Sequence, residues 1–429
     1  MSHALRPHFH FAPARNWMND PNGLVYYKGK YHLFYQYNPE GDQWGNMSWG
    51  HATSVDLFQW QEHPVAIPYT ETHGIFSGSA VVDYFNTSGF GTPENPAMVA
   101  IFTDHLHDGS RQAQSLAFSN DDGITWQQYR NNPVLDLEMK DFRDPKVAWN
   151  TVNEAWVMSV VKPSEFTVAF YQSKDLKKWQ LLSEFSNLNG TDGVWECPDL
   201  FPLAVNNDPS RIKWVLLISV NPGGVTGGSG THYFVGDWNG KEFIPDDRET
   251  RWLDYGRDNY AGVTFNDAPD NRRIYIGWMS NWDYAKLLPA NPSRGSMTIP
   301  RELTLVTIGN QIYLLQNPVK EILGSGISDY QFTITPASSK TGLRFSREDG
   351  TFVEIGYDSQ LNEIYLDRTH SWFEIDSTFV HAAPFCATNP FEVRVILDNG
   401  SVELFVDGGR LAITDLVSTS AAAWSVSTF

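Results

Sequence analysis

Three acidic residues of this chain lie in short stretches that are rich in turn-forming and aromatic residues. Asp20 lies in NWMNDPNGL, Asp144 in FRDP and Glu196 in WECPD. Carboxylic acids that meet in one pocket suit the hydrolysis of a glycosidic bond. One ionised acid attacks the anomeric carbon, and a second, protonated acid gives its proton to the leaving oxygen. Because Asp, Pro, Asn and Gly are strong turn formers, NWMNDPNGL is predicted to be a turn that holds Asp20 at the mouth of a pocket.

The neighbours of two of these acids indicate different roles. Asn19 and Asn22 flank Asp20 and are predicted to donate hydrogen bonds that keep it ionised, as a nucleophile requires. Arg143 precedes Asp144 and is predicted to keep this carboxylate ionised and oriented. Asp144 is therefore interpreted as a group that orients the substrate and stabilises charge, rather than as the acid.

Glu196 stands in a more apolar stretch. It follows Trp195 and precedes Cys197 and Pro198. An apolar frame favours the protonated form of a carboxyl group, so Glu196 is predicted to be the general acid and base.

A repeat along the chain indicates the scaffold that brings these acids together. Five units each contain a turn, a short apolar strand, a second turn and a more strongly apolar strand. Units of about sixty residues with four strands are typical of propeller blades, and this region has no sustained helical periodicity. Residues 1–315 are therefore predicted to form a five-bladed β-propeller. Four units close on a Ser/Asp/Gly turn and an aromatic residue: Trp60, Trp126, Trp179 and Phe243.

The repeat also relates the three acids to one another. Asp20, Asp144 and Glu196 each fall just before the predicted first strand of their unit, in blades one, three and four. First strands line the central channel of a propeller, and the turns that enter them ring one mouth of it. The three acids are therefore predicted to converge on a single funnel.

The pattern changes after the fifth unit. Residues 316–324 are predicted to be a linker, and residues 325–429 contain short alternating strands joined by Asp, Asn and Gly turns. This pattern is typical of a β-sandwich. The whole chain is therefore expected to be all-β, a five-bladed propeller followed by a C-terminal sandwich.

Composition excludes several classes of partner. The formal net charge of −19 argues against nucleic acid, and no stretch approaches the roughly 20 apolar residues of a membrane span. Cys197 and Cys386 have no metal-binding spacing, and no metal or cofactor is expected. The 16 Trp residues fill cores or offer flat faces for sugar rings. Asn-X-Ser/Thr tripeptides, which are glycosylation sites in a eukaryotic secretory pathway, begin at Asn46, Asn86, Asn189 and Asn399.

The motifs WMNDPNG, FRDP and WECPD, in this order, resemble those of glycoside hydrolase family 32, the β-fructofuranosidase group of invertases, exo-inulinases and levanases. YQYNP, FSGS, GWMSNW and SVELFVD match as well, so the resemblance covers essentially the whole chain. It implies that Asp20 is the nucleophile of a fructosyl-enzyme intermediate and that Glu196 is the acid and base. It also implies that Asp144, with Arg143, binds fructose hydroxyls.

The resemblance implies further properties. Sucrose and fructans would be the substrates, and the anomeric configuration would be retained, with the carboxyl groups of Asp20 and Glu196 about 5 to 5.5 Å apart. The N-terminus has no apolar signal region, so the chain is expected to be an extracellular or cell-wall enzyme in its mature form, with a cytoplasmic location and a homodimer left open. The sandwich is shorter than expected for the family. The fructose pocket would be lined by Asn19, Gln36, Trp44 and Ser77, with Phe76 and Trp282 as walls.

Alternative functions differ in the features they need. A fructosyltransferase shares the site and the intermediate, and differs only in whether a sugar or water accepts the fructosyl group. A non-catalytic fructan-binding module would be expected to lack one of the three acids. SNDDGITW also fits a turn found in sialidases, which need an arginine cluster and a tyrosine nucleophile. A five-bladed family that acts on arabinan or xylan uses three carboxylates but lacks WMNDPNG and WECPD.

Overall fold

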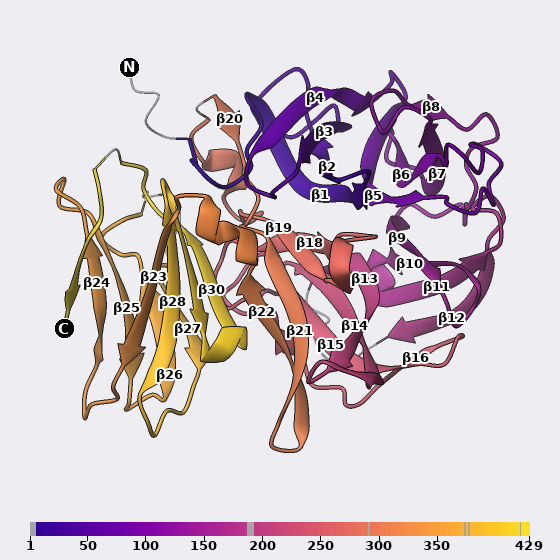
Figure 1. Ribbon diagram of the computed structural model, residues 1–429. Helices are drawn as coiled ribbons and strands as arrows, with labels where there is room; N and C mark the ends of the chain where they lie inside the picture. The colour runs from indigo at the N-terminus through magenta and orange to yellow at the C-terminus, as the bar shows by residue number, and fades with distance from the viewer. Residues whose placement is uncertain (1–5, 187–192, 291, 373–374, 376–377, 421) are drawn as a thin grey trace.

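The structure, a computed structural model, consists mainly of β-strands in two domains (Figure 1). It describes residues 6–186, 193–290, 292–372, 375, 378–420 and 422–429. The tripeptide that begins at Asn189 lies outside these residues. Within the described ranges, no helix is long and apolar enough to cross a membrane.

The first domain is a propeller whose blades are antiparallel sheets. Its first three blades follow the chain without interruption, and η1 (Pro163–Glu165) is a short turn in the third. Blade one contains β1 (Asn16–Tyr27), β2 (Lys30–Tyr37), β3 (Ser48–Ser54) and β4 (Trp60–Ile67). Blade two contains β5 (His73–Val82), β6 (Met98–Leu106), β7 (Gln112–Ser119) and β8 (Gln127–Gln128). Blade three contains β9 (Arg143–Asn150), β10 (Ala155–Lys162), β11 (Thr167–Ser173) and β12 (Gln180–Ser186).

The last two blades are less regular. Blade four contains β13 (Val194–Val205), β14 (Asp208–Asn221), β15 (Gly230–Trp238) and β16 (Phe243–Pro245), and β17 (Arg251–Trp252) also pairs with β15. Blade five contains β18 (Tyr260–Thr264), β19 (Ile274–Trp278), β21 (Arg301–Ile308) and β22 (Gln311–Pro318), with η2 (Pro269–Asn271) and η3 (Ala285–Leu287) between strands. Between them, β20 (Ser293–Arg294) pairs in parallel with β1.

The first strands of the five blades form a closed ring. β1 contacts β5, β5 contacts β9, β9 contacts β13, β13 contacts β18, and β18 contacts β1. The prediction of a five-bladed propeller is therefore confirmed. These five inner strands carry the residues that face the central axis.

A repeated turn explains why the sequence repeat corresponds to the blades. Trp60, Trp126 and Trp179 each donate the indole N–H to the backbone carbonyl three residues earlier, at 2.9, 2.9 and 3.0 Å. In each turn a serine hydroxyl also donates to the aspartate two residues after it: Ser54 to Asp56, Ser119 to Asp121 and Ser173 to Asp175. The Ser/Asp turn and its tryptophan thus form one local unit in three blades.

The prediction that NWMNDPNGL is a turn is wrong. These residues lie within the continuous strand β1, and the other two acids lie within β9 and β13 rather than before them. Proline fits here because an inner strand is the edge strand of its blade, where a missing N–H is tolerated. The same residue types that favour turns also accommodate the irregular backbone of a bulge.

Each of the five inner strands has such a bulge at the same place, where two residues face one residue of the neighbouring strand. The bulged pairs are Asn19–Asp20, Phe76–Ser77, Asp144–Pro145, Cys197–Pro198 and Ala261–Gly262. The backbone φ angles of Asp144, Cys197 and Ala261 are positive, at 64°, 46° and 54°. The bulges therefore re-aim side chains from five strands at one level of the ring.

Below the bulges, a layer of buried polar groups ties the inner strands together. Ser79 Oγ donates to the Pro145 carbonyl at 2.9 Å, and Asn266 Nδ2 donates to the Ala80 and Val147 carbonyls at 2.8 and 2.9 Å. Lys146 donates to the Thr264 carbonyl, and Asp199 accepts from the Thr264 N–H and hydroxyl at 2.7 and 2.8 Å. We call the side chains of Ser79, Lys146, Asp199, Thr264 and Asn266 the staple layer.

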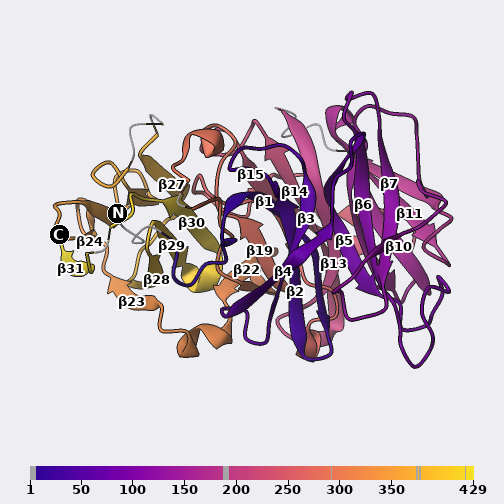
Figure 2. The same ribbon diagram turned by 90° about the horizontal axis from the view of Figure 1, so that it is seen from above.

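The second domain is a sandwich of two sheets that lies against one side of the propeller (Figures 1 and 2). β22 ends at Pro318 and therefore extends into the segment predicted as a linker, and η4 (Lys320–Gly324) follows it. One sheet contains β23 (Ser328–Ile334), β28 (Phe391–Asp398), β29 (Ser401–Val406) and β30 (Leu411–Leu416), with η5 (Asp407–Gly409) before β30. The other contains β27 (Val380–Pro384), β26 (Glu363–Asp367), β25 (Phe352–Asp358), β24 (Thr341–Ser346) and β31 (Ser425–Thr428).

A cluster of buried charges joins the two domains. Arg301 of β21 donates to Asp254 Oδ2 at 2.9 Å and to Glu403 Oε2, on β29 of the sandwich, at 2.5 Å. The other oxygen of Glu403 lies 2.7 Å from His10 Nε2. His10 Nδ1 in turn lies 2.8 Å from Asp398 Oδ2, at the end of β28. We call these five side chains the interdomain network.

Candidate active site

The bulges bring Asp20, Asp144 and Glu196 together at one end of the inner strands. Asp20 Oδ1 accepts from Asn19 Nδ2 at 2.9 Å, and Asp20 Oδ2 accepts from Ser77 Oγ of blade two at 2.7 Å. The thiol of Cys197 lies 3.8 Å from the same oxygen. Asp20 therefore contacts residues of blades one, two and four.

Asn22 does not contribute to Asp20 as predicted. Its side-chain oxygen accepts from the Gly78 N–H at 3.3 Å, and the side chain is fully buried behind the strand. Ser77 donates to Asp20 instead. Ser77 takes the place of Asn22 as a donor because the bulge of β5 directs its hydroxyl towards Asp20 of blade one.

Arg143 binds Glu196 rather than Asp144. Its Nη2 and Nε donate to Glu196 Oε1 at 2.9 and 3.1 Å, whereas Nε lies 3.9 Å from Asp144 Oδ2. Asp144 Oδ2 accepts instead from the backbone N–H of Cys197 at 3.0 Å. Arg143 therefore makes a long ion pair with Asp144, while its hydrogen bonds go to Glu196, because adjacent residues of a strand point in different directions.

Glu196 is surrounded by polar groups and not by the apolar frame that we predicted. Its Oε2 accepts from the hydroxyl of Tyr260, on β18 of blade five, and its Oε1 binds Arg143. Trp195, the supposed apolar neighbour, is fully buried in a core cluster between blades three and four. The Glu196 side chain itself is 20% exposed, so it can reach a ligand in the funnel.

Burial and like charge shape the acidity of the cluster. Burial raises the pKa of Asp20, the negative charge of Glu196 raises it further, and the hydrogen bonds from Ser77 and Asn19 only partly offset this. Burial raises the pKa of Asp144 to about 7, although Arg143 acts in the opposite direction. Asn19 and Arg143 act in the predicted direction, since Asn19 lowers the pKa of Asp20 and Arg143 that of Asp144. Desolvation is the larger effect at both.

The predicted sugar-binding residues surround this cluster. Gln36 lies opposite the bulge of β1 and donates to the Ile75 carbonyl at 3.0 Å. Phe76 stacks on His105 with ring centroids 4.3 Å apart, and its other neighbour is Trp44 at 6.0 Å. Trp44 is 41% exposed, which puts a flat apolar face in contact with solvent at the rim.

Trp282 reaches the cluster through a relay of side chains. It stacks on Trp17 with centroids 5.9 Å apart, and the Trp17 indole donates to Asn19 Oδ1 at 2.8 Å. Asn19 in turn donates to Asp20. The half-buried Trp282 therefore supports the orientation of Asn19 in addition to forming part of the rim.

Sequence reasoning missed two residues that contact the acids directly. Tyr260 opens the fifth repeat unit, and alignment of all five units would have found it. Cys197 lies within WECPD, where the sequence indicates only an apolar frame. In the structure its N–H contacts Asp144 and its thiol contacts Asp20. Within the described ranges, no group of three or more His, Cys, Asp or Glu side chains is arranged to hold a metal ion.

Comparison with known proteins agrees with this geometry. Residues 10–318 match the glycosyl hydrolases family 32 N-terminal domain, and residues 302–429 match the glycosyl hydrolases family 32 C-terminal domain. The chain is 43% identical to a levanase of Bacillus subtilis, over 96% of this chain and 66% of the levanase. It is 38% identical to an extracellular exo-inulinase of Aspergillus awamori, over 97% of this chain and 90% of that enzyme.

Solved structures are similar over nearly the whole chain. The exo-inulinase of Aspergillus awamori has a TM-score of 0.89 at 37% identity and covers 98% of this chain and 94% of its own. A fructofuranosidase of Schwanniomyces occidentalis complexed with fructose has a TM-score of 0.90 at 34% identity, with coverages of 99% and 95%. The chain therefore belongs to glycosyl hydrolase family 32, the β-fructofuranosidase group.

Proposed function

We propose that the chain hydrolyses sucrose and fructans by releasing terminal β-D-fructofuranosyl residues, with retention at the anomeric carbon. The observation that carries this proposal is the convergence of three carboxylates, from three blades, at one level of the ring. Relatives named levanase, exo-inulinase and invertase support the choice of substrates.

In the first step, Asp20 attacks the anomeric carbon and Glu196 protonates the leaving oxygen. Ser77 and Asn19 hold the two oxygens of Asp20 from different sides, which fixes the direction of attack. Because Asp20 is buried, its carboxylate is poorly solvated. This raises its pKa and favours bond formation to carbon.

In the second step, water attacks the fructosyl ester on Asp20. Glu196, now a carboxylate, takes the proton of that water, and Asp20 leaves as a carboxylate. Arg143 and Tyr260 both donate to Glu196, so the charge that it gains in the first step is stabilised in place.

Asp144 is proposed to bind sugar hydroxyls. With a pKa of about 7, it exists in both protonated and ionised forms near neutral pH. It can therefore accept a hydrogen bond from a hydroxyl in one form and donate one in the other. Gln36, Trp44, Phe76 and Trp282 are proposed as the surrounding wall.

Product analysis tests the proposal and separates hydrolysis from transfer. The purified chain is incubated with concentrated sucrose, inulin and levan, and free fructose is compared with longer products by chromatography. Free fructose as the main product is expected. A predominance of trisaccharide from sucrose would instead favour the fructosyltransferase, and the absence of any product would refute both.

Secretion is proposed because several relatives are labelled extracellular. Activity in the culture medium of the native source, rather than in washed cells, is the expected result. Activity confined to the cell interior would contradict it.

A further inference from the structure

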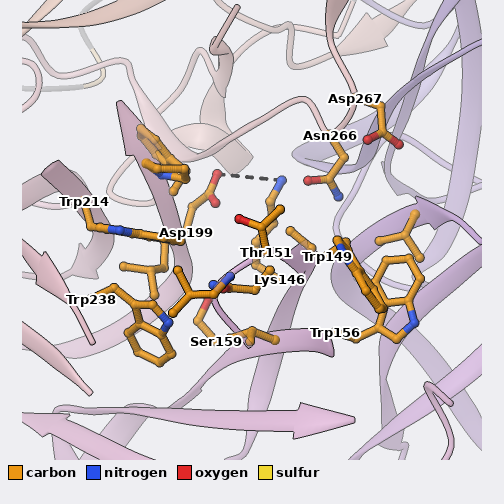
Figure 3. A pocket seen from close by; sticks show the side chains of 18 of the residues that line it. Lys146, Trp149, Thr151, Trp156, Ser159, Asp199, Trp214, Trp238, Asn266 and Asp267 are labelled. Atoms are coloured by element: carbon orange, nitrogen blue, oxygen red, sulfur yellow. Dashed lines mark hydrogen bonds and ion pairs between the residues drawn. The ribbon is translucent and has the colours of Figure 1, made fainter. Parts of the chain in front are cut away.

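A large pocket is lined by residues that follow the catalytic acids on the inner strands, and Figure 3 shows it from close by. Its volume of about 810 Å³ is within the range of small-molecule sites, about 300 to 1,000 Å³. Three members of the staple layer, Lys146, Asp199 and Asn266, line it, together with side chains of blades two to five. We call it the rear pocket.

The rear pocket and the active site are separate. Lys146 and Asp199, which line the pocket, follow Asp144 and Glu196 by two and three residues on β9 and β13, and none of the three acids belongs to the lining. The tryptophan Trp149 lies further away, five residues after Asp144, which corresponds to about 16 Å of extended strand. The hydrogen bonds of the staple layer connect the inner strands at the inner end of the pocket, next to the level of the acids. A ligand in the rear pocket would therefore contact none of the three catalytic acids.

Four tryptophans line the rear pocket in two pairs. Trp149 and Trp156 come from blade three, with ring centroids 5.2 Å apart, and Trp214 and Trp238 come from blade four, with centroids 6.1 Å apart. In Figure 3 the two pairs lie on opposite sides of the Lys146–Asp199 ion pair. The pocket is thus bounded by flat aromatic faces from two blades.

In each pair, the indole N–H of one tryptophan donates within the fold, and that of the other is available to a ligand. Trp156 donates its indole N–H to Thr87 Oγ1 at 2.8 Å, and Trp238 donates to Asn153 Oδ1 at 3.1 Å; both are buried. Trp149 and Trp214 are half-buried, and within the described part of the chain their indole N–H groups have no hydrogen-bond partner. Each therefore offers an apolar face and a free donor.

Aromatic side chains also extend beyond the pocket onto the surface. Tyr84 is 49% exposed and Phe85 is 69% exposed, and both line the pocket next to Trp149. The Phe85 ring lies 5.2 Å from that of Trp149. An exposed apolar surface of this kind, continuous with a cavity, is typical of a binding site.

The lining of the rear pocket has two cations and three acids, and Asp237 shares Lys213 with Asp246, so the net charge is small. Lys146 lies 3.7 Å from Asp199, and Asp237 is paired with Lys213 at 2.9 Å. The remaining cation and anion of the lining are Arg273 and Asp267. The small negative charge disfavours an anionic ligand, and most of the lining charges are already paired, whereas a neutral ligand with apolar faces and many hydroxyls fits the aromatic walls and free donors.

We propose that the rear pocket is a second carbohydrate site, which binds a neutral oligosaccharide segment without hydrolysing it. The choice of a fructan chain as its occupant rests on the proposed function. Such a site would hold a polymeric substrate to the enzyme while chain ends enter the funnel, an effect of effective concentration.

Native gel electrophoresis in the presence of levan tests the binding directly. The inactive variant Asp20→Ala is compared with the same variant carrying Trp149→Ala and Trp214→Ala. Loss of each stacking face is expected to weaken binding about threefold to tenfold, so the triple variant should be retarded much less by levan. Trp424→Ala, which removes a half-buried tryptophan from the sandwich, is the matched control and should leave retardation unchanged.

Kinetics of the active enzyme provide the second readout. Trp149→Ala with Trp214→Ala should leave kcat/KM for sucrose unchanged and raise KM for levan about fivefold or more. If this double variant does not fold, Tyr84→Ala with Phe85→Ala removes exposed aromatics of the same pocket and should act in the same direction.

Equal retardation of all variants by levan would overturn the rear-pocket proposal. It would also be overturned by a parallel loss of activity on sucrose and levan in folded variants. If the chain cleaves neither sugar, the proposed function fails, while the gel comparison still decides whether the rear pocket binds levan.

Discussion

Buried charges gather in two regions of this molecule, and the two regions differ in how well each charge is matched. At the mouth of the propeller, Arg143 pairs with Glu196 and lies 3.9 Å from Asp144, whereas within the described residues no cation pairs with Asp20. In the interdomain network, Arg301 and His10 lie between three acids, and each acid contacts a cation.

The pKa values of the two regions move in opposite directions. In the interdomain network, the neighbouring cations hold the pKa values of Glu403 and Asp398 below their usual range despite burial. The carboxylates of Asp398 and Glu403 in turn raise the pKa of His10 to about 9, against the effect of burial. At the catalytic mouth, burial raises the pKa values of Asp20 and Asp144. The matched charges stabilise the fold. The unmatched charges cost stability and are available to a substrate, as is common at active sites.

Removal of a catalytic carboxylate gives the largest expected effect. Asp20→Asn or Glu196→Gln should lower kcat on sucrose by at least about 10³-fold, because each acid makes or breaks a bond to the reacting atoms. The free energy of unfolding should stay the same or rise, since like charges are separated. Steady-state kinetics and urea unfolding measure the two quantities. Glu94→Gln, an exposed acid, is the control, and near-normal turnover in either catalytic variant would refute the assignment.

The opposite outcome is expected for the central cation of the interdomain network. Arg301→Met should lower the free energy of unfolding by about 3 to 5 kcal/mol, because it leaves Asp254 and Glu403 buried without this cation. Urea unfolding measures the loss. Arg394→Met removes a less buried cation, paired with Asp329 in the same domain, and should cost about 1 kcal/mol or less. An equal loss in the two variants would remove the distinction between the matched network and an ordinary surface pair.

Protonation of His10 makes the contribution of the network to the free energy of unfolding depend on pH. A folded-state pKa of about 9, above the usual value, means that its contribution is complete below about pH 6.5 and is lost as the pH rises through 9. His10→Gln should therefore lower the free energy of unfolding by about 3 kcal/mol at pH 6, and by less at pH 9.5. Unfolding curves at both pH values test this. A loss that is independent of pH would mean that His10 is not protonated in the fold.

The smallest expected effect is an increase in the free energy of unfolding, opposite to the losses in the interdomain network. Asp144→Asn should raise the free energy of unfolding by about 1 to 2 kcal/mol at pH 8, because the amide carries no charge to desolvate and can still accept from Cys197. With a folded-state pKa of about 7, Asp144 destabilises the fold increasingly as the pH rises from about 4 to 7. The gain should therefore vanish near pH 4. A destabilised variant at pH 8 would show that Asp144 is a structural acid like Glu403.

The blade pattern could be predicted from sequence because its signals are local. The turn closed by Trp60 repeats in blades two and three, and its hydrogen bonds join residues only two or three positions apart. The three acids were identified for a related reason, since each lies in a short distinctive motif. Local signals of this kind do not depend on which strands become neighbours.

The contacts of the acids depend on pairing between blades and could not be predicted in this way. Residues of the Asp-Pro-Asn-Gly type fit a turn or a bulge equally, and only the pairing of β1 with β2 decides between them. Arg143 is adjacent to Asp144 in sequence, yet it binds Glu196 of the next blade. Tyr260 marks the start of the fifth repeat unit, but its hydrogen bond to Glu196 of blade four depends on how blades four and five pack together.

The five bulges also bear on how such a ring can change in evolution. Each bulge is a feature of the backbone, present whether its residues are Asn and Asp, Phe and Ser, or Ala and Gly. Ser77 and Ala261 occupy in blades two and five the places that carry acids or acid-binding groups elsewhere. The ring therefore provides five interchangeable positions around one axis. A new specificity can arise by substitution at one of them without a new scaffold.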